Sequence, residues 1–357
     1  MRVAGTMSGT SLDGVDMAVI ATDGVSVTGF GETRYRAYSE VERDVLRAAL
    51  GRWPGEPGVA EAAEVVEAAH LDVLQGLDVD AVAVHGQTLA HEPGGRGTHQ
   101  VGDGARLSSA LGLPVVWDFR TADVELGGQG APLASFYHWA AARFVGAEAP
   151  VAVLNLGGVG NVTWVDPQAE TPDAPGALLA FDTGFANAPM DDVMAARGLG
   201  GFDRDGALAR NGSVDPLVVQ AVMEDPYFYK MPPKSLDRND FAGVAEVVAD
   251  MTDADALASL SACVVASVAR GMEHMPSAPE ALWVTGGGRR NGWLMESLAQ
   301  AVRLPVCPVE EMGLDGDFLE AQAFGYLAVR VMGGRTTSAP GTTGVAAAVG
   351  GGRVSGR

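Results

Sequence analysis

Cysteine and lysine are scarce in this sequence. Cys263 and Cys307 are the only cysteines in 357 residues, which excludes a disulfide framework and a cysteine-rich zinc site. Acidic residues outnumber basic ones by 45 to 24. The resulting net charge of −21 argues against a nucleic-acid partner, because a protein that binds a phosphate backbone needs a basic face. It does not exclude a small anionic ligand, which a few local groups can hold.

Long apolar runs are also absent. No uninterrupted run approaches the ~20 residues that a membrane-spanning helix needs, and the residues after Met1 lack the pattern of a signal peptide. We therefore expect a soluble, cytoplasmic protein with no membrane partner. An apolar content of 47% and 48 glycines are typical of a folded α/β protein with many turns. The chain exceeds the usual size of a single core, which predicts two domains.

Apolar segments with strand spacing alternate with segments of helical spacing. Strands are expected at residues 3–7, 17–21, 25–35, 80–85, 114–117, 151–156, 162–165, 178–181 and 282–285. Helices are expected at residues 46–51, 59–77, 131–145, 215–223, 255–275, 292–301 and 319–332. The plan of strand, Gly-containing turn and strand that starts at Val3 is repeated from Val151. This repeat predicts two similar α/β halves, each with a mostly parallel sheet continuing from the meander.

Domain limits follow from the repeat. We place an N-terminal α/β domain at residues 1–130, completed by the last helix at about 319–345. A C-terminal α/β domain is expected at residues 131–318. The Gly-rich segment 346–357 is expected to be a flexible tail.

The first turn, between residues 7 and 17, is rich in glycine and hydroxyl side chains. Gly5, Gly9 and Gly14 let the backbone approach a ligand closely. Successive amides and hydroxyl groups there could cradle a polyphosphate. Asp13 and Asp16 would repel that anion unless a divalent cation such as Mg²⁺ bridges them. The alternative is a polar hairpin turn with no ligand.

Three further Gly-rich turns follow apolar strands. They are L-N-L-G-G-V-G-N at 154–161, F-D-T-G at 181–184 and V-T-G-G-G-R-R-N at 284–291. Each is placed at the carboxyl end of its strand, where open α/β sheets bind ligands. None is a P-loop, and none completes the dinucleotide-binding pattern. Four such turns in two similar halves indicate a nucleotide clamped between the domains.

Nine motifs follow one another along nearly the whole chain: G-T-M-S-G-T-S-L-D-G-V-D, H-G-Q-T, Q-V-G-D, D-F-R, G-G-Q-G-A-P-L, N-L-G-G-V-G-N, F-D-T-G, V-T-G-G-G-x-x-N and G-D-x-x-E-A-x-A-F. In sequence and order they resemble the motifs of the anhydro-N-acetylmuramic acid kinase family. The resemblance implies an actin/hexokinase/Hsp70-type fold, with two ribonuclease-H-like domains around a central ATP cleft. It also implies a kinase that opens 1,6-anhydro-N-acetylmuramic acid with water and phosphorylates O6, giving N-acetylmuramic acid 6-phosphate in peptidoglycan recycling. A cytoplasmic homodimer that uses ATP and Mg²⁺ is implied as well.

The resemblance assigns the nucleotide site to three of the turns, with Asp13 facing Mg²⁺ or the γ-phosphate. The ATP-binding residues are Ser8, Gly9, Thr10, Ser11, Leu12, Asp13, Gly14 and Val15 in the first turn, Gly157, Gly158 and Asn161 in the second phosphate loop, and Gly286, Gly287, Gly288 and Asn291 beside the adenosine.

Asp182, after an apolar strand, is the expected catalytic base for the attacking water; the alternative is an Asx cap of a turn. Glu320 is the second catalytic candidate, and a carboxylate at the start of the last helix also suits the helix dipole. The resemblance places the sugar at Asp118 and Arg120, with His85 and Gln87 nearby.

Each of these side chains also has a purely structural alternative. Arg120 could bind an oxyanion with its planar fork or pair with Asp123 or Glu125. His85 could instead satisfy a backbone carbonyl at the end of its strand.

Two departures from the family pattern leave the sugar open. The run D-T-G-P-G-N is D-T-G-F-A-N here, with Phe185 and Ala186, and K-S-T-G-R-E is K-S-L-D-R-N, with Leu236 and Asp237. A kinase for another anhydrosugar such as levoglucosan is therefore an alternative. An actin-like or chaperone-like ATPase that acts on protein partners is an alternative from another class.

The only two lysines, Lys230 and Lys234, lie together in this second region. Their retention is either chance or a need for a point charge. Arg120 and the Lys234 loop are our candidate partners for the lactyl carboxylate of the sugar.

Overall fold

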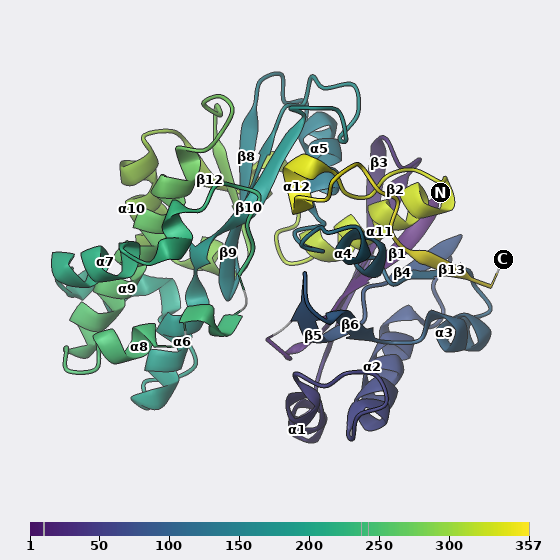
Figure 1. Cartoon of the computed structure of the whole chain (residues 1–357), viewed down its shortest axis with the longest axis horizontal. Coiled ribbons are helices and arrows are strands. Elements are labelled where there is room, and N and C mark those ends of the chain that lie inside the picture. The colour runs from purple at the N-terminus through teal and green to yellow at the C-terminus, as the bar shows by residue number, and fades with distance from the viewer. Residues whose placement is uncertain (10, 237, 242, 357) are drawn as a thin grey trace. The chain divides into compact units, whose positions relative to one another are not determined.

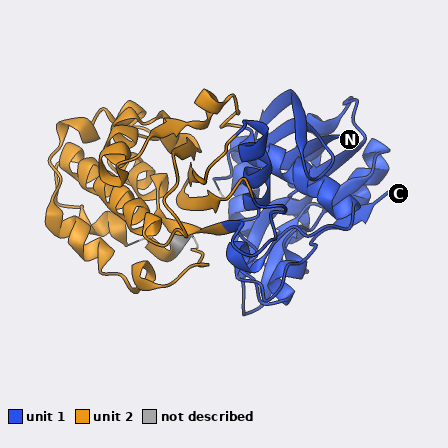
Figure 2. Ribbon diagram, turned by 90° about the horizontal axis from the view of Figure 1, so that it is seen from above, with its two compact units in different colours: residues 1–146, 169–178, 318–357 blue, residues 147–168, 179–317 orange. Residues whose placement is uncertain are grey.

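The computed structural model describes residues 1–9, 11–236, 238–241 and 243–356. The chain divides into two compact units (Figure 2). Unit 1 comprises residues 1–146, 169–178 and 318–357, and unit 2 comprises residues 147–168 and 179–317. The first boundary thus falls at residue 146 rather than at 130. Residues 131–146 belong to unit 1 because the helix that they contain packs against the last long helix of the chain.

Unit 1 contains a six-stranded sheet in the order β13-β7-β4-β1-β2-β3 and a separate β5–β6 hairpin (Figure 1). Its strands are β1 (Arg2–Met7), β2 (Gly14–Thr22), β3 (Val27–Ala37), β4 (Ala81–Val84), β5 (Gln87–Glu92), β6 (Gly97–Val101), β7 (Val115–Trp117) and β13 (Arg353–Ser355). Its helices are α1 (Glu40–Ala49), α2 (Val59–Leu74), α3 (Gly104–Leu111), α4 (Thr121–Glu125), α5 (Ser135–Phe144), α11 (Leu319–Met332) and α12 (Pro340–Thr343).

Unit 2 contains a five-stranded sheet in the order β10-β9-β8-β11-β12. Its strands are β8 (Val151–Leu156), β9 (Val159–Val165), β10 (Leu178–Phe185), β11 (Leu282–Thr285) and β12 (Val306–Pro308). Its α-helices are α6 (Asn187–Ala196), α7 (Pro216–Met223), α8 (Val244–Val247), α9 (Asp253–Met272) and α10 (Gly292–Val302). Short 3₁₀ helices lie at Arg204–Gly206, Ala209–Asn211, Pro226–Tyr229 (η3), Arg238–Phe241, Gly287–Arg290 (η5) and Val309–Met312.

The predicted repeat of the meander is confirmed. In unit 1, β1 pairs antiparallel with β2 and parallel with β4, which pairs parallel with β7. In unit 2, β8 pairs antiparallel with β9 and parallel with β11, which pairs parallel with β12. Each unit is therefore a mixed sheet in which two parallel strands follow a three-stranded meander. The expectation of a mostly parallel sheet is wrong for unit 1, because its pairs β1–β4 and β4–β7 are parallel whereas β1–β2, β2–β3 and β7–β13 are antiparallel.

Helices cover both faces of the unit 1 sheet. On one face Ala4 and Met17 belong to the same buried cluster as Val66 and Ala69 of α2. On the other face α11 approaches β1 so closely that a Cβ on Gly5 would lie 1.9 Å from the carbonyl oxygen of Ala321. Only glycine permits this approach of a helix to a strand, which explains why the first strand carries a glycine.

The core of unit 2 is built around α9. Leu257, Leu260 and Val264 of this helix are buried together with Leu294 and Leu298 of α10. Within the described part of the chain, α9 is the one helix long and apolar enough to cross a membrane. Most of that stretch is buried by protein (61%), so we interpret it as a core helix.

Several elements differ from the sequence-based expectation. The helix expected from residue 46 begins at Glu40, where Ser39 and Glu42 form a capping box. The β5–β6 hairpin and α3 were not expected at all. The tail is not uniformly irregular, because Arg353–Ser355 pairs with β7 as an antiparallel strand.

Candidate functional site

The three Gly-containing segments of unit 2 lie toward the carboxyl ends of β8, β10 and β11. The expectation of a turn at F-D-T-G is wrong, because residues 181–184 lie within β10. Asn187, at the start of α6, donates its backbone N–H to the Gly157 carbonyl (2.8 Å) and its side-chain amide to the Leu156 carbonyl (2.8 Å). A Cβ on Gly288 would lie 2.6 Å from the Cβ of Leu156 and 3.2 Å from the Asn187 Oδ1. The strand ends therefore bring these turns into one region, as the sequence predicted for ligand-binding turns.

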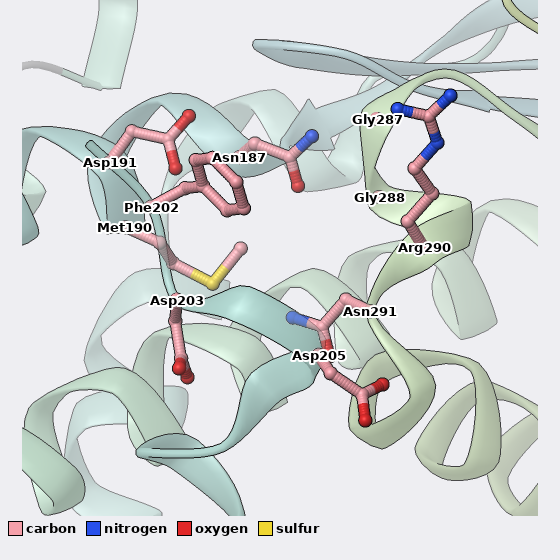
Figure 3. A pocket seen from close by; sticks show the side chains of 10 residues that line it. All are labelled: Asn187, Met190, Asp191, Phe202, Asp203, Asp205, Gly287, Gly288, Arg290 and Asn291. Atoms are coloured by element: carbon pink, nitrogen blue, oxygen red, sulfur yellow. The ribbon is translucent and has the colours of Figure 1, made fainter. Parts of the chain in front are cut away.

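A pocket of about 280 Å³ opens in this region of unit 2 (Figure 3). It is lined by Asn187, Met190, Asp191, Phe202, Asp203, Asp205, Gly287, Gly288, Arg290 and Asn291. Figure 3 shows Asn187 and Phe202 facing the Gly287–Gly288 backbone across the pocket. Its lining combines two large apolar side chains, Met190 and Phe202, with polar and charged groups that could orient a small molecule. Three of the four residues expected beside adenosine, Gly287, Gly288 and Asn291, line this pocket.

The fourth residue, Gly286, sets the shape of the turn. Its φ is +75°, and a Cβ there would lie 2.3 Å from the Asn155 Oδ1, so a side chain would be both strained and blocked. The Gly286 carbonyl accepts a hydrogen bond from Arg289 Nη1 (3.0 Å). Arg289 is nearly buried and also binds Glu310 (2.7 Å) and Asp317 (2.9 Å). This ion-pair network fixes the turn that forms one wall of the pocket.

Asn291 has a structural task as well as a place in the pocket. Its Oδ1 accepts the backbone N–H of Leu294 (3.0 Å), which caps the N-terminus of α10. The turn at Gly157–Gly158, predicted to bind phosphate, is fixed by a residue that follows β10: the N–H of Ala186 donates to the Gly158 carbonyl (2.9 Å). Asn161 lies further along β9, and the nearby Gly160 carbonyl accepts from Thr183 Oγ1 (3.1 Å).

Asp182 lies on β10 and is 8% exposed. Its carboxylate Oδ2 accepts the backbone N–H of Leu236 (2.8 Å). Its backbone carbonyl accepts from the Tyr227 hydroxyl (2.5 Å), and its backbone N–H donates to the Lys234 carbonyl (2.9 Å). The residue is part of a strand rather than the cap of a turn, so its side chain is not consumed by local turn formation.

Lys234 is not an exposed cation. Its residue is 8% exposed, and its ammonium donates to the Tyr227 carbonyl (3.1 Å) and lies 4.5 Å from the centroid of the Tyr227 ring. Burial, together with the nearby charges of Arg270 and Lys230, lowers the pKa of the Lys234 ammonium to about 8. The geometry ties this lysine to its own segment of unit 2, which disfavours the sequence-based idea that it binds the lactyl carboxylate.

The first turn, in unit 1, is held by side chains from two other segments. Ser8 is buried, and its hydroxyl donates to Gln87 Oε1 (2.5 Å) and lies 3.1 Å from the Tyr38 hydroxyl. The Gln87 amide donates to the Gly9 carbonyl (3.2 Å). Leu12 is buried with φ +56°, a conformation that costs energy for a branched side chain. Thr10 lies outside the described residues.

Asp13 ends this turn and is exposed. Its Oδ1 accepts the Ser11 hydroxyl (2.7 Å), and its carbonyl accepts the Tyr35 hydroxyl (2.9 Å). Gly14 and Val15 continue directly into β2. Among the described residues, no group of three or more His, Cys, Asp or Glu side chains could hold a metal by itself. A single exposed carboxylate beside a phosphate-binding turn nevertheless fits Mg²⁺, which is usually held by one or two carboxylates plus phosphate oxygens.

His85, Arg120 and Glu320 form a second group in unit 1. Arg120 Nε donates to His85 Nε2 (3.0 Å), and Arg120 Nη1 donates to the Gly130 carbonyl (2.5 Å). Because a guanidinium can only donate, His85 Nε2 must accept, so the ring proton is on Nδ1 and binds the Gly86 carbonyl (2.7 Å). Burial and the charge of Arg120 lower the pKa of His85 well below its usual value, which keeps the ring neutral.

Burial raises the pKa of the Glu320 carboxyl, and the charge of Arg120 partly opposes that shift. The sequence offered Asp123 as an alternative partner for Arg120. Asp123 instead accepts from Ser338 (2.5 Å), Thr343 (2.6 Å) and the Gly130 N–H (2.7 Å). His85, Arg120 and Glu320 are therefore brought together, as expected of neighbouring site residues.

Asp118 stands apart from this group. One carboxylate oxygen accepts the Thr121 hydroxyl (2.5 Å), and the other pairs with Arg353 Nε (2.9 Å). Both oxygens thus already have a partner within unit 1, which holds the carboxylate in a fixed orientation. Its assignment to the sugar stays a prediction, as does the meeting of the unit 1 turn with those of unit 2.

The sequence reasoning missed residues that act through tertiary contacts. Tyr38, Asn187, Phe202 and Tyr227 were not selected, although each contacts a predicted site residue or lines the pocket. The motif D-T-G-F-A-N does contain Asn187. An Asn directly after a Gly-containing strand end, at the start of a helix, is the one signal that could have indicated it.

Comparison with known proteins identifies close relatives. A family model described as anhydro-N-acetylmuramic acid kinase matches residues 1–355. The chain is similar to the anhydro-N-acetylmuramic acid kinase of Cereibacter sphaeroides, at 63% identity over 98% of this chain and 95% of the relative. It is also similar to that of Ruegeria sp., at 59% identity over 99% of this chain and 94% of the relative.

Solved structures with low sequence identity were also found. A glucokinase of the ROK family from Streptomyces griseus, in complex with glucose and AMPPNP, has a TM-score of 0.46 at 14% identity, covering 92% of this chain and 99% of its own. An activator of 2-hydroxyisocaproyl-CoA dehydratase from Clostridium difficile, with bound ADPNP, has a TM-score of 0.45 at 13% identity, covering 92% of this chain and 94% of its own.

Proposed function

The chain belongs to the anhydro-N-acetylmuramic acid kinase family, and from that premise we propose that it phosphorylates 1,6-anhydro-N-acetylmuramic acid with ATP. The reaction adds water across the intramolecular ether at the anomeric carbon and transfers the γ-phosphoryl group to the freed O6. The product is N-acetylmuramic acid 6-phosphate, which places the enzyme in cytoplasmic peptidoglycan recycling. The match over residues 1–355 carries this proposal.

Asp182 acts as the general base for the attacking water in this proposal. A base must reach the proton that it removes and must keep a fixed orientation. The Leu236 N–H holds one carboxylate oxygen of Asp182 (2.8 Å), which fixes the orientation of the carboxylate that takes the proton in this proposal. Glu320 is the second catalytic candidate. Burial raises the pKa of its carboxyl, which favours the protonated form that can donate a proton to a leaving oxygen.

In this proposal, different turns bind different parts of the nucleotide. The pocket of unit 2 takes the adenosine, with Gly287, Gly288 and Asn291 along it. Gly157, Gly158 and the first turn of unit 1 take the phosphates through backbone amides. Asp13 holds Mg²⁺ together with phosphate oxygens; the ion supplies charge that stabilises phosphoryl transfer.

Arg120 takes the lactyl carboxylate of the sugar in this scheme. A guanidinium binds a carboxylate through two parallel hydrogen bonds, which gives both orientation and energy. His85 holds the guanidinium at Nε, and Gln87 connects the same strand end to the first turn. By family resemblance, the active form is a homodimer.

Three of the departures from the family pattern, Phe185, Ala186 and Leu236, do not favour another anhydrosugar. Phe185 is buried in the unit 2 core, where its ring contacts Phe241 (5.5 Å between centroids), and Ala186 is fully buried. Leu236 packs against the same core. Side chains that face the core change packing rather than the recognition of a ligand. Asp237 lies outside the described residues.

A coupled ADP-release assay tests the proposal directly. The purified protein is given ATP and Mg²⁺ with anhydro-N-acetylmuramic acid, with levoglucosan or with no sugar. ADP release that depends on the anhydromuramic sugar is the expected result. Faster release with levoglucosan would transfer the assignment to another anhydrosugar, and equal release in all three arms would indicate an ATPase that acts on a different kind of partner.

A further inference from the structure

We propose that Tyr227 and Lys234 are positioning residues that hold Asp182 in its catalytic orientation, and that the positive charge of Lys234 is needed for this task. The inference rests on the proposed function, because it takes Asp182 as the general base. We refer to Tyr227, Lys234 and Leu236 together as the Asp182 clamp. No member of the clamp has to touch the sugar for the proposal to hold.

The clamp grips Asp182 at three points. Its backbone carbonyl accepts the Tyr227 hydroxyl (2.5 Å), its backbone N–H donates to the Lys234 carbonyl (2.9 Å), and its carboxylate accepts the Leu236 N–H (2.8 Å). All three partners come from one segment that begins at η3 and runs alongside β10. The orientation of the proposed base therefore depends on where this segment lies.

The ammonium of Lys234 connects two members of the clamp, because it contacts Tyr227. It donates to the Tyr227 carbonyl (3.1 Å) and lies 4.5 Å from the centroid of the Tyr227 ring. The positive charge strengthens both interactions, since a charged donor makes a stronger hydrogen bond and an aromatic face attracts a cation. If Lys234 loses its charge, the contacts that join the two ends of this segment are weakened.

Burial of the Lys234 ammonium costs free energy that other interactions must offset. Lys234 is 8% exposed, and burying a charge is unfavourable unless it gains compensating interactions. The titratable groups around the ammonium are Arg270 and His274 at and after the end of α9, Lys230 and Tyr227 in its own segment, and Asp182 on β10. Burial of the ammonium, together with repulsion by Arg270 and Lys230, lowers the pKa of Lys234 to about 8.

The charge is therefore lost within an accessible pH range. Above pH 8 the neutral amine predominates, so the clamp weakens as the pH rises through that value. The other nearby groups titrate elsewhere: burial raises the pKa of Tyr227 above 10, and burial with Lys234 lowers the pKa of His274 below 6.5. The expected signature is a fall in kcat as the pH rises through about 8, with KM for ATP little changed.

The decisive experiment compares Lys234→Met and Lys234→Arg with the wild-type protein over pH 6–10 in the coupled assay. Lys234→Met should fold, because it removes a buried charge, and should lower kcat by about 10- to 100-fold, as expected when a catalytic group is slightly displaced. Its kcat should also lose the alkaline decline near pH 8. Lys234→Arg keeps a permanent charge, so it should retain more activity than Lys234→Met and also lack that decline.

Two further variants complete the test. Tyr227→Phe removes only the hydroxyl bound to Asp182, so it should lower kcat while keeping the alkaline decline. Lys230→Met, at an exposed lysine of the same segment, should leave the plateau of kcat unchanged. It should also move the decline to slightly higher pH, because one repelling charge is gone.

The outcomes separate this inference from the proposed function. If the wild-type protein does not phosphorylate anhydro-N-acetylmuramic acid, the proposed function fails. If it does, but Lys234→Met keeps wild-type kcat or the same alkaline decline, the clamp is refuted while the kinase assignment stands. Equal losses in Lys234→Met and Lys234→Arg, with unchanged nucleotide affinity, would show that shape rather than charge matters and would also overturn the proposal.

Discussion

Replacing Asp182 by asparagine is the most direct test of the proposed chemistry. The amide has nearly the size of the carboxylate, and its oxygen can still accept the Leu236 N–H that now binds Oδ2 (2.8 Å). The backbone contacts of Asp182 with Tyr227 and Lys234 do not involve its side chain. We therefore expect Asp182→Asn to fold with a melting temperature close to that of the wild-type protein.

The catalytic effect should be large, because an amide cannot take a proton from water. Loss of a general base typically costs about 10²–10⁴ in rate. At about 1.36 kcal/mol for each factor of ten, this corresponds to a barrier raised by about 2.7–5.4 kcal/mol. Asp182 does not line the unit 2 pocket, so the affinity for ATP should change by no more than about twofold.

The assay measures ADP release at saturating ATP and anhydro-N-acetylmuramic acid, together with ATP binding by calorimetry. Asp166→Asn is a matched control, since Asp166 likewise accepts a backbone N–H, that of Gln168 (2.9 Å), but lies in the connection after β9. The control should keep wild-type kcat. Wild-type turnover by Asp182→Asn would refute the assignment of the base and would make Glu320 the next candidate.

Two further predictions concern unit 1. Arg120→Met should raise KM for anhydro-N-acetylmuramic acid by about tenfold or more, because a charge-assisted hydrogen bond contributes about 1.5–3 kcal/mol, while kinetics with a neutral anhydrosugar should barely change. Equal losses on both sugars would instead assign Arg120 to the phosphoryl group. Gly5→Ala should lower the free energy of unfolding by about 1–3 kcal/mol, because its Cβ would lie 1.9 Å from the Ala321 carbonyl. The control is Gly29→Ala, whose Cβ would meet nothing within 4 Å, and it should change the free energy of unfolding by less than about 0.5 kcal/mol. Urea unfolding measures both variants, and similar losses in the two would contradict the packing argument.

The sequence predicted the buried strands and the long core helices well, because these carry continuous or periodic apolar runs. The start of α1 was misplaced by six residues, since its first turn is exposed and has no apolar pattern. The signal there was local chemistry, the Ser39–Glu42 capping box, rather than periodicity. The pairing of β13 with β7 could not be predicted, because it joins segments that are far apart in the sequence and only three residues long.

In the candidate site, too, some features could be predicted from the sequence and others could not. The Gly-rich turns that follow β8 and β11 were located correctly, because backbone geometry requires glycine at positions such as Gly286, where φ is positive and a Cβ has no room. The prediction of a turn at F-D-T-G is wrong, since residues 181–184 lie within β10. The roles of Tyr227 and Lys234 were not predictable, since they bind the backbone of Asp182 rather than a side chain. A backbone atom carries no residue-specific signal in the sequence, so its partners become visible only when the chain is folded.

The structure also narrows the choice between the two cations considered for the lactyl carboxylate. The ammonium of Lys234 already makes its contacts within its own segment of unit 2. The hydrogen bonds of Arg120 described above go to neutral acceptors, the ring of His85 and the carbonyl of Gly130. The pKa of His85 is lowered well below its usual value. The ring is therefore neutral and does not change the charge beside the guanidinium. The guanidinium of Arg120 stays charged at physiological pH, and under the proposed assignment its replacement should discriminate between an anionic and a neutral sugar.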